Sequence, residues 1–172
     1  MNMFQLLKAS LMEPKKQAAA RILPVGKILQ FVFLFIALLT MLSFFELLRD
    51  LDEAALGMDG LVDYTSDIGW LLYPFGLIML FVTTTVYHFT GISIFAFIGL
   101  GFLAIRKKKG EYRHMWRTAA LAATGPTLFA TVLSIFGVTF WILAAVMAAT
   151  LVLLWIDARW YPNRPSSRPA SR

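Results

Sequence analysis

The 172-residue chain contains no cysteine, which excludes disulfide bonds, thiol catalysis and thiolate metal sites. It also contains little charge. Only 15% of its residues are charged and 59% are hydrophobic, whereas soluble globular domains average about a quarter charged. Asp, Glu, Lys and Arg are absent from two long stretches, Ile68–Ile105 and Thr118–Ile156. Because the apolar excess lies in such runs, the composition predicts an all-α integral membrane protein.

The charges that are present are mainly positive and give a formal net charge of +6. In a soluble protein this excess would indicate nucleic acid as a partner. In a membrane protein, Lys and Arg gather in cytoplasmic loops, where anionic lipid headgroups and the insertion machinery favour them. We therefore expect a bilayer with anionic headgroups, and not nucleic acid, to be the partner of these basic residues.

Four apolar segments are long enough to cross a hydrocarbon core about 30 Å thick. The first is too long for the apolar region of a signal peptide and no cleavage site follows it, so we expect it to be retained. These predicted spans are residues 28–48, 68–105, 118–136 and 138–156. Together they predict one helical membrane domain over residues 1–159.

A short helix is predicted before the first span, over residues 3–12. Phe4, Leu7 and Leu11 recur there at helical spacing, and Pro14 ends the pattern. Such a helix can lie on the membrane interface, or it can pack on the rest of the protein.

The second span has two possible geometries because it is nearly twice as long as the core requires. Residues 68–105 would make a helix about 55 Å long. They therefore form either one long crossing, broken at the polar patch Thr83–Gly91, or a hairpin of two short helices, which would give five spans. One crossing keeps the basic loop 106–117 and the tail 160–172 on the side of the N-terminus. We favour it, with both termini cytoplasmic, because Lys and Arg resist export.

Two connecting segments and the tail complete the predicted organisation. Residues 49–67 form an external acidic loop, whose spacing does not match a calcium-binding EF-hand. Residues 106–117 form a cytoplasmic basic loop. Residues 160–172 are rich in Pro, Ser and Arg and are predicted to be disordered.

A polar site inside the membrane is predicted around His88, since an ionisable side chain within an apolar run is a functional candidate. Thr84 is close in sequence, and Thr124 and Pro126 interrupt the third span. The structural alternative is a neutral His88 bonded to a threonine or a backbone carbonyl. Lipid or partner contact on the cytoplasmic side is predicted for Arg106, Lys107, Lys108, Lys109, Tyr112, Arg113, Trp116 and Arg117.

No sequence pattern indicates catalysis. The chain has no phosphate-binding loop, nucleophile elbow or zinc-protease motif. His88 and His114 lack the further ligands that a zinc site needs. We therefore expect no enzymatic activity, no cofactor and no metal.

Three groups of residues form a recognisable pattern. The first is Asn2-x-Phe4 with Lys8-x-Ser10-Leu11 and Pro14-Lys15, and the others are Tyr112-Arg113-x-x-Trp116-Arg117 and Thr124-x-Pro126-Thr127. The pattern resembles a bacterial family of membrane proteins, catalogued as domain of unknown function 1189 and often labelled maltodextrin-utilisation protein. Members of that family typically have a larger external region than residues 49–67. The resemblance implies a bacterial plasma-membrane protein without known catalytic residues, and its label points to a carbohydrate importer as a neighbour.

These observations lead to two expectations about function. The first is a non-enzymatic accessory or scaffold protein of the bacterial plasma membrane that binds another membrane protein or itself, possible partners including a carbohydrate importer. The alternative is a small oligomeric transporter or channel with a polar broken helix around His88.

Overall fold

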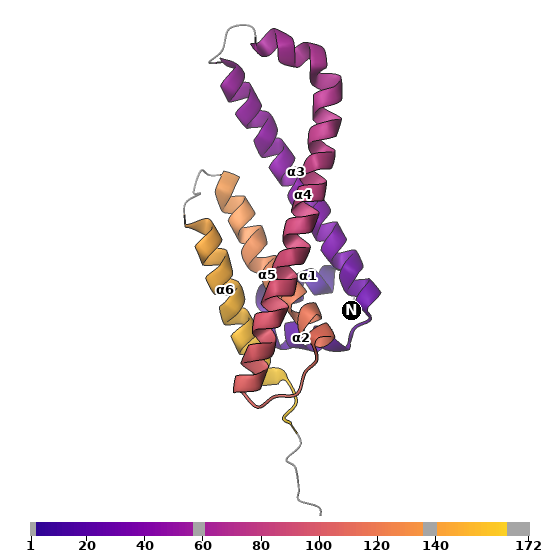
Figure 1. Ribbon diagram of the computed structural model, residues 1–172, viewed down its shortest axis with the longest axis vertical. Helices are drawn as coiled ribbons and strands as arrows, with labels where there is room; N and C mark the ends of the chain where they lie inside the picture. Colours follow the sequence, from indigo (N-terminus) through magenta and orange to yellow (C-terminus); the bar gives the residue numbers. More distant parts are fainter. Residues whose placement is uncertain (1–2, 57–60, 136–140, 165–172) are drawn as a thin grey trace, which may run out of the picture.

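The computed structural model describes residues 3–56, 61–135 and 141–164, and within these ranges all the secondary-structure elements are helices. This confirms the predicted all-α fold. One isolated bridge pairs Lys108 with Asn163. The helices, drawn in Figure 1, are α1 (Met3–Met12), α2 (Pro14–Ala19), η1 (Ala20–Ile22), α3 (Val25–Leu56), α4 (Leu61–Ile105), α5 (Tyr112–Ile135), α6 (Ile142–Asp157) and η2 (Ala158–Trp160).

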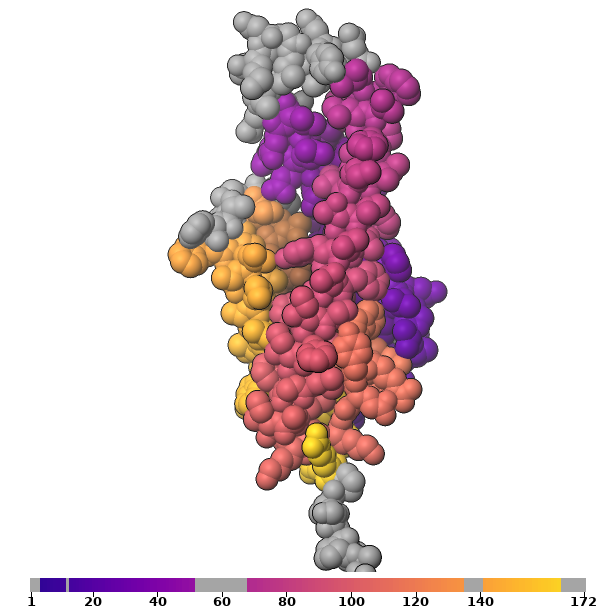
Figure 2. Space-filling view, in the orientation of Figure 1, coloured from indigo at the N-terminus to yellow at the C-terminus, as the bar shows by residue number. Residues whose placement is uncertain are grey.

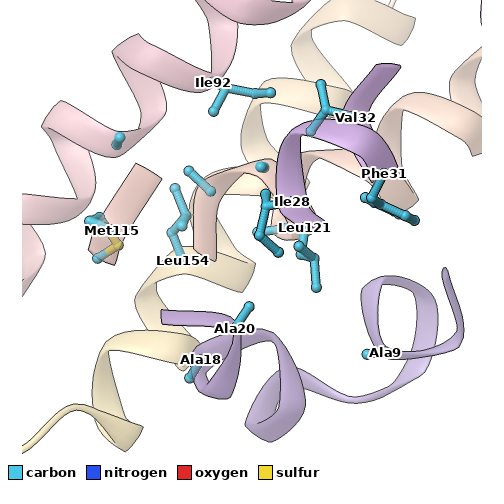
Figure 3. Packing of buried hydrophobic residues seen from close by; sticks show 14 of the residues in the cluster. Ala9, Ala18, Ala20, Ile28, Phe31, Val32, Ile92, Met115, Leu121 and Leu154 are labelled. Atoms are coloured by element: carbon cyan, nitrogen blue, oxygen red, sulfur yellow. The ribbon is translucent and has the colours of Figure 1, made fainter. Parts of the chain in front are cut away.

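Helix α5 forms the centre of the fold. It contacts α1, α2, α3, α4, α6 and η1. The run from Thr118 to Thr124 is buried along its whole length, and all but one of its side chains are alanine or threonine. Small side chains allow helices to approach closely on every side. In Figure 3, Leu121 lies among Ile28, Val32 and Leu154, which come from helices on either side of α5.

Three helical stretches are long and apolar enough to cross a membrane, judged by length and composition over the described residues. They are Val25–Leu51, Ile68–Ile105 and Ile142–Trp160. The predicted span 118–136 is not among them, although α5 covers almost all of it. Because neighbouring helices surround α5, its surface need not be as apolar as that of a helix that faces lipid.

Helix α4 is continuous over its 45 residues, which corrects the predicted break or hairpin at Thr83–Gly91. The hairpin of two short helices, on which the alternative with five spans rests, does not form. Two polar side chains of this region, Thr85 in the patch and Ser93 just after it, form hydrogen bonds within the helix. Thr85 Oγ1 donates to the Phe81 carbonyl at 2.6 Å, and Ser93 Oγ donates to the Phe89 carbonyl at 2.8 Å. A hydroxyl that donates to the carbonyl four residues earlier in the same helix does not require the helix to break.

Most of the predicted acidic loop is also helical. Helix α3 continues to Leu56 and α4 begins at Leu61. Only the connection between them lies outside the described residues. In Figures 1 and 2, the α3–α4 pair extends well beyond the end of the α5–α6 hairpin. The acidic residues of segment 49–67 that the structure places in helices, such as Asp50, lie on this extension.

Helix α1 packs against the protein rather than standing apart from it. Leu6 and Ala9 are completely buried, whereas Phe4 is 78% exposed. The buried face is therefore offset from the predicted face of Phe4, Leu7 and Leu11. A side chain at Gly125 of α5 would have its Cβ 3.0 Å from the Ser10 carbonyl oxygen, so α1 lies directly on α5.

Gln17 ties α2 to the end of α1. Its Nε2 donates to the carbonyls of Ala9 and Ser10, at 3.2 and 2.8 Å. The last carbonyls of a helix have no partner inside that helix. Gln17 supplies a donor to the Ser10 carbonyl and a second donor to the Ala9 carbonyl, which also accepts from Glu13 N at 3.2 Å. Helices α1 and α2 therefore form one packed N-terminal unit.

Candidate functional site

His88 lies inside the bundle, as the sequence predicted. Its side chain is 6% exposed and packs against the ring of Phe35 on α3, with ring centroids 5.4 Å apart. Its Nε2 atom is buried and has no hydrogen-bond partner among the described residues. A buried polar atom without a partner is costly, and so it marks a place where a ligand atom could bind.

A cavity of about 640 Å³ adjoins His88 between α4, α5 and α6. Small-molecule sites typically have volumes of about 300–1,000 Å³ and mainly apolar linings with a few polar groups. The polar groups here are few, and most lining side chains are apolar. The lining includes Thr83, His88, Thr90, Thr127, Met147 and Leu151. We call this space the His88 cavity.

The other three predicted site residues do not line the His88 cavity. Thr124 is buried and its Oγ1 donates to the Ala120 carbonyl at 2.8 Å. Pro126 has no N–H and cannot donate to the Ala122 carbonyl, four residues earlier in the helix. The Thr124 hydroxyl does not replace this bond, because it donates to Ala120. Helix α5 nevertheless continues through Pro126.

Threonines that sequence reasoning did not select line the cavity in place of Thr84 and Thr124. Thr83, Tyr87 and Thr90 follow one another at spacings of four and three residues. Such residues share one face of a helix. The sequence therefore contained this spacing, but it indicates a shared face only if the helix is continuous through the segment.

The predicted basic residues at the other end of α4 separate into distinct roles. Arg106 stacks on the Trp155 ring, with its guanidinium carbon 3.9 Å from the ring centroid. Trp116 stacks on Phe89, with ring centroids 6.0 Å apart. Arg106 and Trp116 therefore hold α6 against the end of α4 and α5 against α4, respectively.

The segment after α6 is fixed to the 106–111 connection, in contrast to the disorder predicted from residue 160 onward. Lys109 N donates to the Pro162 carbonyl at 2.8 Å, and Arg164 N donates to the Lys107 carbonyl at 3.1 Å. The side chains of Lys108 and Asn163 bond at 2.7 Å. Residues 165–172 lie outside the described residues.

A second cavity, of about 520 Å³, opens where η1, the 109–111 segment, the start of α5 and Tyr161 meet. Cationic side chains dominate its polar lining. The cationic side chains are Arg21, Lys109, Arg113 and Arg117; the lining also includes the carboxylate of Glu111 and the ring of His114. We call it the basic cavity. Of the predicted contact residues, it gathers Lys109, Arg113 and Arg117.

The arginines of the basic cavity are held by backbone carbonyls. Arg117 Nη1 donates to the carbonyls of Arg21 and Leu23, both at 2.8 Å. Arg21 Nη1 donates to the Trp160 carbonyl at 2.9 Å, and its guanidinium lies 4.9 Å from the centroid of the Tyr161 ring. These bonds join the segment before α3 to the segment after α6.

Tyr161 closes the inner side of this cavity. It is 2% exposed, its hydroxyl lies 2.7 Å from Thr118 Oγ1, and it donates to the His114 carbonyl at 3.2 Å. Burial raises the pKa of Tyr161 from about 10 to about 12, against the opposing effects of the Thr118 hydrogen bond and the charges of Arg21 and Arg117. Neither Tyr161 nor Arg21 was predicted as a site residue, because their meeting depends on contacts between distant parts of the chain.

Asp157 occupies an unexpected position at the end of α6. It is completely buried, and neither carboxylate oxygen has a hydrogen-bond partner among the described residues. It lines neither the His88 cavity nor the basic cavity. Within the described residues, no group of three or more His, Asp or Glu side chains is arranged to hold a metal ion.

Comparison with known proteins identifies the family. The chain belongs to the family described as protein of unknown function (DUF1189), whose sequence profile matches residues 49–156. The matched region contains Tyr112–Arg117 and Thr124–Thr127, which carry the resemblance in the sequence. No curated protein matches the chain, and no solved structure does.

Replacing Tyr161 by Phe should lower thermal stability in detergent by about 1 kcal/mol, because it removes a buried hydrogen-bonding hydroxyl. The wild-type protein should also lose stability between about pH 10 and 12. In this range the unfolded tyrosine has released its proton while the folded one retains it, so rising pH favours unfolding. Tyr161→Phe should reduce that loss.

The control for this experiment is Tyr112→Phe, because Tyr112 is 42% exposed. Thermal unfolding followed by circular dichroism at a series of pH values measures all three proteins. Identical pH dependence in wild type and Tyr161→Phe would contradict the role given to the buried hydroxyl.

Proposed function

We propose that the protein spans the bacterial plasma membrane four times, with both ends in the cytoplasm. The three apolar helical stretches support insertion, and α5, surrounded by its neighbours, serves as the remaining crossing. The hydrogen bond from Arg21 to Trp160 supports an even number of crossings, because it joins the segment before α3 to the segment after α6.

The distribution of charge supports the orientation. Arg21, Arg106, Arg117 and Arg164 all lie at the end where the terminal segments meet, whereas Asp50 lies on the opposite extension of α3. Positive residues favour the cytoplasmic side of a membrane.

Single cysteines test this orientation, since the chain has none of its own. In intact cells, a membrane-impermeant maleimide should label Gly60→Cys between α3 and α4. It should label Lys109→Cys only after the membrane is permeabilised, because Lys109 is exposed at the proposed cytoplasmic end. Labelling of Lys109→Cys in intact cells would reverse the proposed topology.

We further propose that the protein acts without catalysis, as an accessory or scaffold that binds another membrane protein through α6. The observation that carries this proposal is the exposure of Ala144, Ala145, Ala148 and Ala149 on this helix. Pairs of small residues four apart permit close contact between helices in lipid, where the hydrophobic effect provides no driving force. In α5 the chain uses such residues internally, whereas in α6 it leaves them on the surface.

The class of partner follows from the resemblance to proteins labelled for maltodextrin utilisation. A membrane subunit of a carbohydrate importer would present the apolar helices that an alanine face can pack against. A second copy of this chain is the other partner that the same face could bind.

The double substitution Ala144→Leu/Ala148→Leu should abolish co-purification of a stoichiometric membrane partner from native membranes. Two leucines would hold a facing helix too far away for backbone contact. Affinity purification in mild detergent followed by mass spectrometry measures the loss. The control is Ala37→Leu, because Ala37 is an exposed alanine of α3 and lies outside the alanine face of α6. Retention of the partner by the double variant would count against this interface.

A second function, a small oligomeric transporter or channel, is supported by the His88 cavity. Its volume and its single unpartnered Nε2 atom suit a mainly apolar solute that carries one hydrogen-bonding group. The continuous α4 removes the broken helix from this proposal but keeps the polar group at its centre.

A photoreactive diazirine derivative of a medium-chain alcohol should label the peptide around His88 in reconstituted vesicles. His88→Ala should reduce this labelling about fivefold, as expected for the loss of one hydrogen bond of about 1 kcal/mol. His114→Ala is the control, because His114 lies outside this cavity. Equal labelling of His88→Ala and His114→Ala would exclude His88 as the binding group. Solute flux unchanged by His88→Ala would exclude transport through the His88 cavity.

A further inference from the structure

We propose that the basic cavity binds a phosphate group, supplied either by an anionic lipid headgroup or by a soluble phosphate compound. The site is distinct from the α6 face and from the His88 cavity, so it stands independently of both functions proposed above. Its walls come from four segments that are distant in sequence: η1, residues 109–111, the start of α5 and Tyr161–Pro162.

The charge of the cavity is not neutralised from within. Glu111 Oε2 lies 2.6 Å from Arg113 Nε and compensates that arginine. Arg21, Lys109 and Arg117 have no carboxylate partner among the described side chains. Three cationic groups therefore face one space of about 520 Å³ without a carboxylate at salt-bridge distance among the described residues, and like charges held close together favour an anion between them.

Two of these cations are held in place before any ligand binds. Arg117 Nη1 donates to the carbonyls of Arg21 and Leu23, and Arg21 Nη1 donates to the Trp160 carbonyl. A guanidinium has five N–H donors, so each arginine keeps others available for an anion. Fixed arginines lose little conformational entropy on binding, which favours tight recognition of phosphate.

The first turn of α5 adds a further favourable element. This 24-residue helix begins at Tyr112, and Arg113, His114 and Arg117 of its first turns line the cavity. The amino end of a helix carries a partial positive charge, which stabilises a bound phosphate.

The position of the cavity makes a lipid headgroup accessible. It lies beside the ends of two apolar stretches, Ile68–Ile105 and Ile142–Trp160. At the proposed cytoplasmic surface, a lipid could place its phosphate among Arg21, Lys109 and Arg117 while its chains remain beside the helices. Basic pockets between membrane helices recognise anionic headgroups in this way.

The test uses the full chain purified in neutral detergent, with native mass spectrometry as the readout. Phosphatidylglycerol, phosphatidylcholine and inorganic phosphate are titrated separately. We expect phosphatidylglycerol to bind more tightly than phosphatidylcholine. Arg21→Gln and Lys109→Gln should each weaken this binding about tenfold, the effect of losing one charge-assisted contact.

The matched controls are Arg159→Gln and Lys107→Gln. Each removes one positive charge from an exposed residue of the same end that does not line the cavity. Both should leave the binding of phosphatidylglycerol within about twofold of wild type. Lys109→Gln guards against misfolding, since the Lys109 side chain is exposed and only its backbone is used in the fold.

Two outcomes support the site and identify the source of the phosphate. Cavity-dependent binding of the lipid alone identifies a headgroup. Cavity-dependent binding of inorganic phosphate that competes with the lipid identifies a soluble phosphate compound. Equal weakening by cavity and control variants would show only general attraction between charges and overturn the proposal. Equal affinity for phosphatidylglycerol and phosphatidylcholine, with no binding of inorganic phosphate, would overturn it as well.

Discussion

The close packing around the first half of α5 is the constraint on which the rest of the structure depends. From Thr118 to Thr124 every side chain of this helix except Leu121 is alanine or threonine, small enough for neighbours to approach closely. The contact with α1 is closer still, because Gly125 meets the Ser10 backbone without a side chain between them. In a lipid bilayer, the environment proposed for this protein, no hydrophobic effect draws helices together, so such van der Waals contact would be the main attraction between them. Larger residues here would separate α5 from its neighbours and leave both cavities without a wall.

Under the proposed topology, this constraint explains why the most buried helix is missing from the stretches that hydropathy selects. A helix that faces lipid needs a continuous apolar surface, but a helix enclosed by protein needs only to fit. Helix α5 is therefore rich in Ala and Thr and is not apolar enough to be counted among the three stretches that could cross a membrane. The four apolar runs could be recognised in the sequence because length and apolarity are local properties. Which of those runs lies at the centre is a property of the assembled fold.

The same distinction separates the site residues that could be predicted from those that could not. His88 could be selected because an ionisable residue in an apolar run is unusual wherever it points. Its neighbours in the cavity could not, because the polar patch was interpreted as a break and the helical phase across it was lost. Thr83 and Thr90 share a face only if the helix continues between them.

The basic end depends on contacts that no local pattern contains. Arg21 and Trp160 are 139 residues apart, and Arg117 and Arg21 are 96 apart. The abundance of Lys and Arg near residues 106–117 predicted a charged surface but not a cavity. Arg106 belongs to the same basic run as Lys109, yet its guanidinium stacks on the Trp155 ring within the fold. Only the folded chain separates the cations that build the structure from those that remain available to a ligand.

The geometry of α5 also keeps the two cavities apart. Arg117 lines the basic cavity and Ala123 lines the His88 cavity. Six residues along a helix correspond to a rise of about 9 Å and a rotation of about 240°. The two cavities therefore lie on different sides of the same helix, and a ligand in one need not contact a ligand in the other. A coupling between them would have to pass through α5 itself, whose tight packing leaves it little freedom to shift without disturbing every neighbour.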